Sequence, residues 1–360
     1  MNHKNTLIKR LVSSLKPSKP NLNQDKRFLV LSTTGLGDTL WATPAIRALR
    51  ECFPSCYLGV MTSPTGQGVL KNNRHIDEFF TVKDPVLTRL APLYFRLKAK
   101  KITHVFSFHT SQRAILPLAA VIGAQEVIGS YGINKGLDCL LTQALDNLGM
   151  HEIQRRLHIV AQVGAHTLDP AMEVFVSPED EKLAELALDR LSVPSYLPLI
   201  GLHPGSKDVF KRWPITHFIN LGNRLVQEVG CQILVTGNAQ EKESAEYIAS
   251  HIPSAVAITD LPVLALAAFF KKLRLLITND TGPMHLGFAQ KVPTLGLFVP
   301  TNPELCGPYF TPLGAALSKK PTCTPCLKKR CQEPFCLLQI GVEEVYTAAL
   351  KLLYGAHVPS

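Results

Sequence analysis

Four short segments of the chain combine glycine with charged or hydroxyl side chains, the residue types that bind phosphates and move protons. In the first, residues 32–38, Gly35 and Gly37 would let the backbone turn sharply before a helix whose free N–H groups can approach a ligand. Asp38 begins that helix, and its carboxylate either caps the helix or accepts a proton from an incoming hydroxyl group. Leu40 stands where a dinucleotide-binding loop has its third glycine, which argues against an NAD fingerprint.

The second segment, residues 202–214, follows a predicted strand and is rich in cations. Ser206 supplies a hydroxyl group, and Lys211 and Arg212 supply positive charges, all after the same strand. Backbone donors, a hydroxyl group and cations in one loop would hold a diphosphate. A solvated basic loop is the alternative interpretation of the same residues.

The third segment places a carboxylate after a glycine turn. Glu241 follows Gly237, which ends a strand pattern, and stands near the start of a predicted helix. A carboxylate at this position could accept hydrogen bonds from the hydroxyl groups of a ribose. It could also stabilise the N-terminus of the helix, so the residues alone leave both roles open.

The fourth segment, residues 277–286, is the most specific local pattern. Asp280, Thr281 and Gly282 end a buried strand and begin a helix whose unpaired N–H groups would attract an anion. His285 lies one turn into that helix, on a face that could reach the same anion. An isolated histidine is more often structural, but the combined pattern is more specific than any single residue.

Short apolar runs, separated by helical patterns, must position these segments. We expect buried strands at RFLVLS, YLGVMT, DEFFTV, THVFSF and EVIGS in the first half, and at LPLIGLHPGS, CQILVTG, AVAIT, LRLLITND and TLGLFVP in the second. A helix is expected to run directly from the first glycine loop through residues 39–50, and residues 43–52 and 113–122 have helical apolar spacing. The alternation of strand and helix predicts an α/β protein with parallel sheets.

The pattern restarts after an irregular stretch, which indicates two domains. We predict a basic N-terminal tail over residues 1–26, a first Rossmann-like domain over 27–175 and a second over 176–353. The irregular stretch, residues 130–175, contains one probable helix over 152–163. Two doubly wound domains in sequence would face each other across a cleft, with the carboxyl ends of both sheets toward it.

The positive charge of the chain is concentrated in two places. The 360 residues carry 38 Lys and Arg against 28 Asp and Glu, a net charge of +10. Residues 1–27 have seven cations and one Asp, and residues 318–336 have five cations and one Glu, so together they account for the whole excess. We therefore expect no nucleic-acid-binding surface on the domains. The tail is either a disordered segment or an amphipathic helix for an anionic membrane surface.

Cysteine usage and apolar run lengths bear on the compartment. Nine cysteines in a chain whose N-terminus has no signal-peptide pattern indicate reduced thiols and a cytoplasmic protein, and no apolar run approaches a membrane span. Cys323, Cys326, Cys331 and Cys336 lie within one loop, 318–336. Four thiols this close could bind zinc, but structural zinc sites more often use two separated pairs. We interpret the loop as reduced and assign no metal.

The four segments, in this order and spacing, resemble the signature segments of the ADP-heptose:lipopolysaccharide heptosyltransferases, glycosyltransferase family 9. The resemblance covers roughly residues 27 to 353. It implies a GT-B fold in which the first domain binds most of the acceptor and the second binds the nucleotide-sugar. It also implies an inverting, metal-independent transfer of heptose from ADP-heptose to a hydroxyl group of the lipopolysaccharide inner core, without a cofactor.

The resemblance also implies a role for individual residues. Asp38 matches the family's general base, and Lys211 matches the lysine that contacts the donor diphosphate. Ser206 falls where a hydroxyl residue meets phosphate, and Glu241 falls where an acidic residue meets the adenosine ribose. The segment around the diphosphate and the sugar corresponds to Asp280, Thr281 and Gly282, with His285 beside it. The predicted substrate-binding set is completed by Gly35, Gly37 and Arg212.

The acceptor is less closely defined than the donor. Many relatives carry a serine or arginine in the loop that here contains Gly35, and the region 60–130 has only scattered cations, such as Lys71, Arg74 and Arg113. Kdo, a first heptose and a more distal sugar all remain candidate acceptors.

The expected partners are the donor, the glycolipid and, peripherally, the cytoplasmic face of the inner membrane. The alternatives are a GT-B transferase with another nucleotide-sugar and a non-catalytic binding protein of the same fold.

Overall fold

The computed structural model describes residues 25–85, 90–190, 196–331 and 335–355, and the chain divides into two compact units. The N-terminal unit spans Met1–Met172 and the C-terminal unit spans Glu173–Ser360. Nearly all of the predicted basic tail, 1–26, lies outside the described residues. No helix among the described residues is long and apolar enough to cross a membrane.

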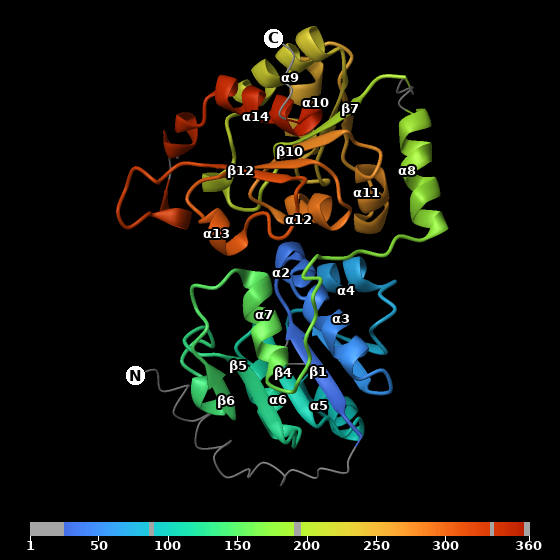
Figure 1. Cartoon of the computed structure of the whole chain (residues 1–360), viewed down its shortest axis with the longest axis vertical. Helices are drawn as coiled ribbons and strands as arrows, with labels where there is room; N and C mark the ends of the chain where they lie inside the picture. Colours follow the sequence, from blue (N-terminus) through green and yellow to red (C-terminus); the bar gives the residue numbers. More distant parts are fainter. Residues whose placement is uncertain (1–24, 86–89, 191–195, 332–334, 356–360) are drawn as a thin grey trace. The chain divides into compact units, whose positions relative to one another are not determined.

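The N-terminal unit is built on a parallel six-stranded sheet in the order β3-β2-β1-β4-β5-β6 (Figure 1). Its strands are β1 (Arg27–Ser32), β2 (Tyr57–Thr62), β3 (Glu78–Thr81), β4 (His104–His109), β5 (Glu126–Ser130) and β6 (Gln143–Leu145). The central strands are continuous apolar runs because helices cover both faces of the sheet. Ser32 pairs with Thr62 on one side and with His109 on the other, so the three strands end level with each other.

Helices connect these strands and carry the residues at the sheet edge. They are α2 (Leu36–Leu40), α3 (Thr43–Cys52), α4 (Pro64–Leu70), α5 (Leu90–Ala99), α6 (Ile115–Val121) and α7 (Glu152–Ala161), together with the 3-10 turn η2 (Asp138–Leu140). Helix α7 packs against α3, β4 and β5. This places the irregular stretch of the sequence next to the end of β4.

The helical segment predicted over residues 43–52 is confirmed as α3, but the prediction that one helix runs directly from the glycine loop through residues 39–50 is wrong. Helix α2 ends at Leu40 and α3 begins at Thr43. Pro44 has no N–H group to donate to the Leu40 carbonyl, and the hydroxyl group of Thr43 donates to it instead, at 2.8 Å. The break leaves the first turn of α2 as a separate short element that carries Asp38.

The C-terminal unit repeats the architecture with the order β12-β11-β10-β7-β8-β9. Its strands are β7 (Leu199–His203), β8 (Gln232–Thr236), β9 (Val256–Ile258), β10 (Leu275–Asn279), β11 (Thr294–Phe298) and β12 (Gly314–Ser318). Its helices are α8 (Pro178–Arg190), α9 (Ile215–Val229), α10 (Lys242–Ser250), α11 (Val263–Phe270), α12 (Gly282–Ala289), α13 (Pro303–Cys306) and α14 (Val342–Tyr354), with 3-10 turns η3 (Val209–Lys211), η4 (Lys328–Arg330) and η5 (Phe335–Gln339). The predicted class, two Rossmann-like doubly wound parallel-sheet units, is confirmed.

Trp213 fixes the loop after β7 to the core of the C-terminal unit. Its side chain is 1% exposed, and its indole N–H donates to the carbonyl oxygen of Ile340 at 2.8 Å. Its backbone N–H donates to the side-chain oxygen of Asn279 at 3.0 Å, and the Asn279 amide donates to the carbonyl oxygen of Pro204 at 2.7 Å. The ends of β7 and β10 are therefore tied together by side chains as well as by strand pairing.

Replacing Trp213 should weaken this anchor measurably. Trp213→Phe leaves the buried Ile340 carbonyl without its donor and reduces the packed volume, so the free energy of unfolding of the C-terminal unit should fall by about 2–4 kcal/mol. Urea denaturation followed by circular dichroism measures this. Tyr196→Phe, at a side chain 83% exposed, is the control and should change stability little. Equal stability of Trp213→Phe and the control would contradict the anchoring role.

Candidate functional site

Asp38 lies at the carboxyl edge of the N-terminal sheet, directly after β1. Helix α2 is preceded by Gly35, which occupies the N-cap position, so Asp38 stands in the first turn and the capping interpretation of this residue is wrong. Its side chain is 27% exposed. The carboxylate is thus accessible to a ligand and held in place from one side.

The two glycines before Asp38 have ordinary backbone conformations, Gly35 extended and Gly37 within α2. Gly35 has φ −77° and ψ −178°, a conformation open to any residue, and neither Gly35 nor Gly37 has a positive φ. The predicted need for conformational freedom is therefore wrong at both positions. A Cβ atom at Gly35 would stand 4.0 Å from Oδ2 of Asp38, so glycine leaves this side of the carboxylate uncovered.

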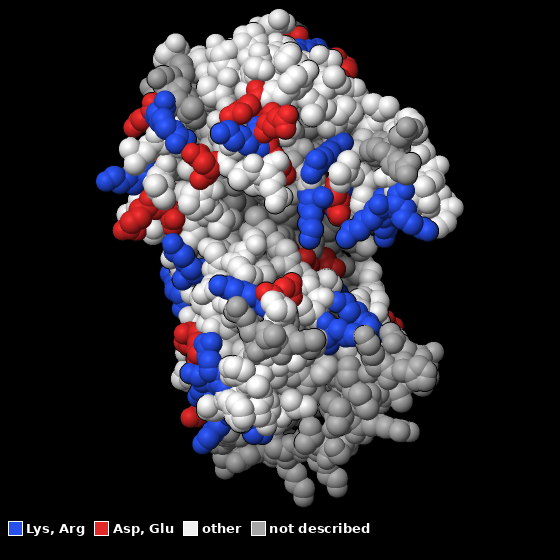
Figure 2. Space-filling model, turned by 180° about the vertical axis from the view of Figure 1, so that it is seen from behind, with Lys and Arg blue, Asp and Glu red and all other residues white. Residues whose placement is uncertain are grey.

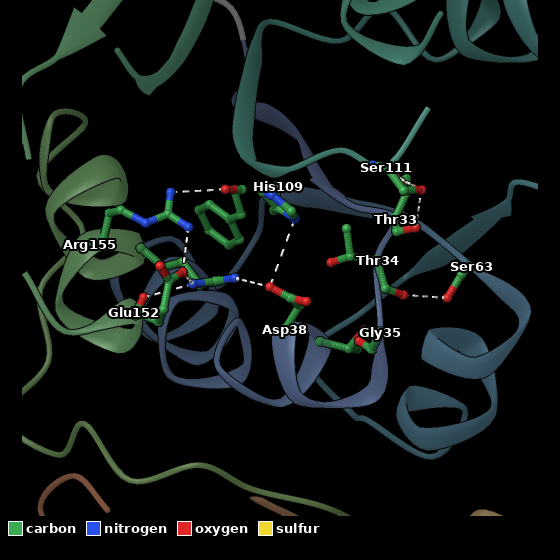
Figure 3. A network of polar contacts seen from close by, with 12 residues as sticks. Thr33, Thr34, Gly35, Asp38, Ser63, His109, Ser111, Glu152 and Arg155 are labelled. Atoms are coloured by element: carbon green, nitrogen blue, oxygen red, sulfur yellow. Dashed lines mark hydrogen bonds and ion pairs between the residues drawn. The ribbon is translucent and has the colours of Figure 1, made fainter. Parts of the chain in front are cut away.

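Two basic side chains face the Oδ1 atom of Asp38, as Figure 3 shows. Nη2 of Arg156 donates to Oδ1 at 3.3 Å, and Nδ1 of His109 lies 3.8 Å from the same oxygen. Burial lowers the pKa of His109 below its ordinary value, although the Asp38 carboxylate opposes this shift. His109 is therefore neutral at neutral pH, and Arg156 is the charged partner of Asp38.

Arg156 is held in turn by a buried network on α7. Its side chain is fully buried, and it shares the carboxylate of Glu152 with Arg155, whose Nη2 donates to Oε2 at 2.5 Å. Arg155 also donates to the carbonyl oxygen of Phe108 and to the hydroxyl group of Ser130, both at 3.0 Å. Burial opposes ionisation of Glu152, but the two guanidinium groups outweigh it and lower its pKa to about 2.

Two predicted residues of the C-terminal unit, Lys211 and Asp280, meet where β7 and β10 lie side by side. Lys211, at the end of η3, donates to Oδ2 of Asp280 at 2.5 Å, and the hydroxyl group of Thr301 donates to the same oxygen. Asp280 is only 6% exposed. The three donors of an ammonium group allow Lys211 to keep this ion pair while it binds a second anion.

Helix α12 begins beside that ion pair. Thr281 is its N-cap residue and makes no side-chain cap, and Gly282 is its first residue. Pro283 has no N–H group, and the Met284 N–H donates to the Thr281 carbonyl oxygen at 3.1 Å, so in the first turn the Gly282 N–H is left for an anion. His285 is 2% exposed and contacts Phe288 edge to face, so it lies in the packed part of α12. Its predicted role beside the diphosphate stays a prediction.

Glu241 reaches across from the loop after β8 to the loop after β7. It occupies the N-cap position of α10 without capping it, and its Oε2 accepts the N–H of Asn238 at 2.9 Å. A Cβ atom at Gly205 would stand 2.2 Å from Oε1 of Glu241, so this carboxylate needs glycine there. Ser206 is 3% exposed, and its carbonyl oxygen accepts from Nε of Arg212 at 2.7 Å.

Sequence reasoning missed Arg156, His109 and Thr301. One signal was available: Glu152 precedes Arg155 and Arg156 by three and four positions in a predicted helix, the spacing of intrahelical ion pairs. Nothing local connects Arg156 with Asp38, because the contact spans 118 positions.

The cysteine cluster shows no metal-binding arrangement in the described part of the chain. No group of three or more His, Cys, Asp or Glu side chains there lies close enough to hold a metal ion. All nine cysteines are free, and Cys336 is buried, which raises the pKa of its thiol. The Sγ atom of Cys326 accepts the N–H of Lys328 at 3.4 Å, so this cysteine shapes the loop.

The chain is similar to known proteins over most of its length. A family model described as glycosyltransferase family 9 (heptosyltransferase) matches residues 118–336. Lipopolysaccharide heptosyltransferase 1 of Pseudomonas aeruginosa is 25% identical, and the match covers 91% of this chain and 98% of that protein.

Two solved structures share the architecture. The glycosyl transferase family 9 protein from Veillonella parvula has a TM-score of 0.80 at 25% identity, over 93% of this chain and 99% of that one. The ADP-heptose lps heptosyltransferase II of E. coli has a TM-score of 0.72 at 19% identity, over 91% of this chain and 98% of that one. The predicted GT-B fold is confirmed.

The ion pairs of Glu152 on α7 should make the free energy of unfolding depend on pH in the acidic range. Because the pKa of Glu152 is lowered from 4.5 to about 2, its ionisation stabilises the fold above pH 4.5, and this contribution is lost as the pH falls toward 2. Between these pH values, the free energy of unfolding of the wild type should therefore fall by about 2–3 kcal/mol more than that of Glu152→Gln. Denaturant titrations at each pH measure this difference. Glu51→Gln, at an exposed position, is the matched control. Parallel curves for wild type and Glu152→Gln would contradict this.

Proposed function

Because the chain belongs to glycosyltransferase family 9, the heptosyltransferases, we propose that it transfers a heptose from ADP-heptose to the inner core of lipopolysaccharide. The chain is a glycosyltransferase, and its relatives in Pseudomonas aeruginosa and E. coli are named as lipopolysaccharide heptosyltransferases. The observation that carries the proposal is the ion pair of Lys211 and Asp280 beside the open N-terminus of α12.

The C-terminal unit would bind the donor through three neighbouring loops. The carboxylate of Glu241 accepts hydrogen bonds from the ribose hydroxyl groups of ADP, and Lys211 with the Gly282 N–H of α12 binds the diphosphate. The Asp280 carboxylate holds Lys211 in position, and the Thr301 hydroxyl group donates to that carboxylate. The role of Asp280 is therefore to position the lysine and not to contact the phosphate. A fixed cation and a fixed backbone donor stabilise the charge that develops on departing ADP, which supports transfer without a metal.

Asp38 would act as the general base. It accepts the proton of the acceptor hydroxyl group while the oxygen attacks the anomeric carbon, and the bond from that carbon to the diphosphate oxygen breaks on the opposite face. One in-line displacement inverts the configuration of the sugar. Arg156 positions the carboxylate through Oδ1, and Gly35 leaves Oδ2 open for the acceptor.

The acceptor class sets where the protein would work. The lipid end of lipopolysaccharide lies in a membrane, so we propose that the enzyme acts at the cytoplasmic face of the inner membrane as a peripheral protein.

The decisive experiment incubates the purified chain with ADP-heptose and truncated lipopolysaccharides that end in Kdo, a first heptose or a later sugar. Mass spectrometry should find one acceptor that gains one heptose, with release of ADP. No gain with any acceptor would contradict the proposal.

Replacing Asp38 should separate catalysis from donor binding. We expect Asp38→Asn to lower kcat by about 10²–10⁴-fold, because the amide cannot accept the proton, while the Kd for ADP stays within about twofold. Single-turnover assays and calorimetry measure the two quantities. Asp189→Asn is the charge-matched control, since Asp189 is exposed and lies in the other unit. A kcat for Asp38→Asn near that of wild type would rule out the base.

A substitution at Gly205 should move the carboxylate of Glu241. The Cβ atom of Gly205→Ala meets only the flexible end of Glu241, so the fold persists and the carboxylate is displaced. The Kd for ADP should rise about 10–100-fold, as for Glu241→Gln, because a charged hydrogen bond to the ribose is lost. Gly341→Ala, where φ is −77° and no atom lies within 4 Å, should bind ADP like wild type. Loss of affinity in Glu241→Gln but not in Gly205→Ala would refute this coupling.

A further inference from the structure

A cavity of about 610 Å³ in the C-terminal unit joins Lys211 to the cysteine-rich loop. Phe210 and Lys211 line it from η3, and Thr301 lines it from the segment after β11. Lys328, Lys329 and Arg330 line it from η4, and η4 contacts η3 directly. The loop that the sequence singled out for its cysteines is therefore part of the surroundings of Lys211.

The cavity is strongly positive. Its lining has four cationic side chains and one carboxylate, Asp208. Lys328, Lys329 and Arg330 are exposed, and none of them forms an ion pair with a carboxylate of the described residues. Figure 2 shows Lys and Arg side chains crowded along one margin of the C-terminal unit. Cations that outnumber carboxylates around a concave surface attract an anion from solution.

The backbone of the loop is shaped to hold these cations. Lys328 has φ +49°, a left-handed conformation that a lysine adopts at a cost, and its N–H group is bound by Sγ of Cys326 at 3.4 Å. Cys336 and Leu337, at the other end of the loop, are buried in the hydrophobic core of the unit. The cysteines thus anchor and turn a loop whose basic residues reach the cavity.

We propose that Lys328, Lys329 and Arg330 form, together with Lys211, an anion subsite that binds a phosphoryl group during transfer. The inference rests on the proposed function, which places the donor diphosphate at Lys211. The phosphoryl group belongs either to the nucleotide-sugar or to a phosphorylated sugar of the acceptor core, and both present the same chemistry to the subsite. In either case the cysteine-rich loop takes part in substrate binding.

The test uses the full chain with the substitutions K328Q, K329Q and R330Q together. In the first arm, calorimetry measures the Kd for ADP and for inorganic pyrophosphate. In the second arm, kcat/KM is measured for an acceptor core before and after enzymatic removal of its phosphates. If the bound phosphoryl group belongs to the donor, both Kd values of the triple variant should rise at least tenfold. If it belongs to the acceptor, the Kd values should stay unchanged, and kcat/KM should fall at least tenfold for the phosphorylated core alone.

A second triple variant controls for net charge. K271Q, K272Q and R274Q remove the same charge before β10, at the opposite end of the strand from Asp280. This control variant should have the Kd and kcat/KM values of the wild type. K329Q alone, an exposed position, repeats the test if the triple variant unfolds at a lower temperature. Unchanged values in both arms would overturn the inference.

The two proposals fail in different ways. If wild type binds pyrophosphate but not ADP or ADP-heptose, the proposed donor is wrong. The subsite is then supported if K328Q/K329Q/R330Q loses pyrophosphate binding, and is refuted if it does not. If wild type binds ADP and transfers heptose while the triple variant matches it in every measurement, the donor assignment stands and the subsite does not exist.

Discussion

Strands of a parallel sheet end at a common edge, and in both units the site residues occupy the loops at that edge. In the N-terminal sheet the strand order reverses between β1 and β4; Asp38 follows β1 and His109 ends β4. In the C-terminal sheet it reverses between β7 and β10; Lys211 follows β7 and Asp280 follows β10. Strand pairing thus brings side chains 69 positions apart to 2.5 Å. The chemistry of each unit depends on this one constraint of topology.

Charges at these edges are compensated by other charges. Arg156 is fully buried and bonds to both Asp38 and Glu152, and Lys211 bonds to Asp280. Breaking such a pair leaves one charge buried without a partner, which costs far more than the pair gains. The site residues are therefore fixed before any ligand arrives. The cations of η4 differ, since no described carboxylate pairs with them, and this difference is why they can take up an external anion.

Much of the fold could be predicted from the sequence, because buried parallel strands are continuous apolar runs with glycine or proline at their ends. The edge strands β6 and β12 escaped prediction because they are only partly buried and lack such a run. The helix after β1 was predicted as continuous because local apolar spacing outweighed Pro44. These errors occur where one proline or an edge position overrides the pattern of the neighbouring residues.

The candidate site was predictable by residue type but not by contact. The types and spacing singled out Asp38, Lys211 and Asp280, yet the capping role considered for Asp38 and the conformational role of Gly35 were wrong. Both errors have the same cause: α2 begins at Leu36, earlier than we predicted, so that Gly35 is the N-cap residue and Asp38 lies inside the helix. The partnership of Arg156 with Asp38 depends on the packing of α7 against the sheet, which only the folded chain reveals.

The contact between Gly205 and Glu241 couples the amino-acid substitutions that these two positions can accept. The carboxylate occupies the volume that any side chain at position 205 would fill. The two positions therefore share one space, and a side chain added at position 205 displaces the carboxylate at position 241. Position 241 can shorten while position 205 stays glycine, but a larger residue at position 205 alone changes what position 241 can bind. A substitution at position 205 would thus act on the nucleotide through position 241, without a contact of its own.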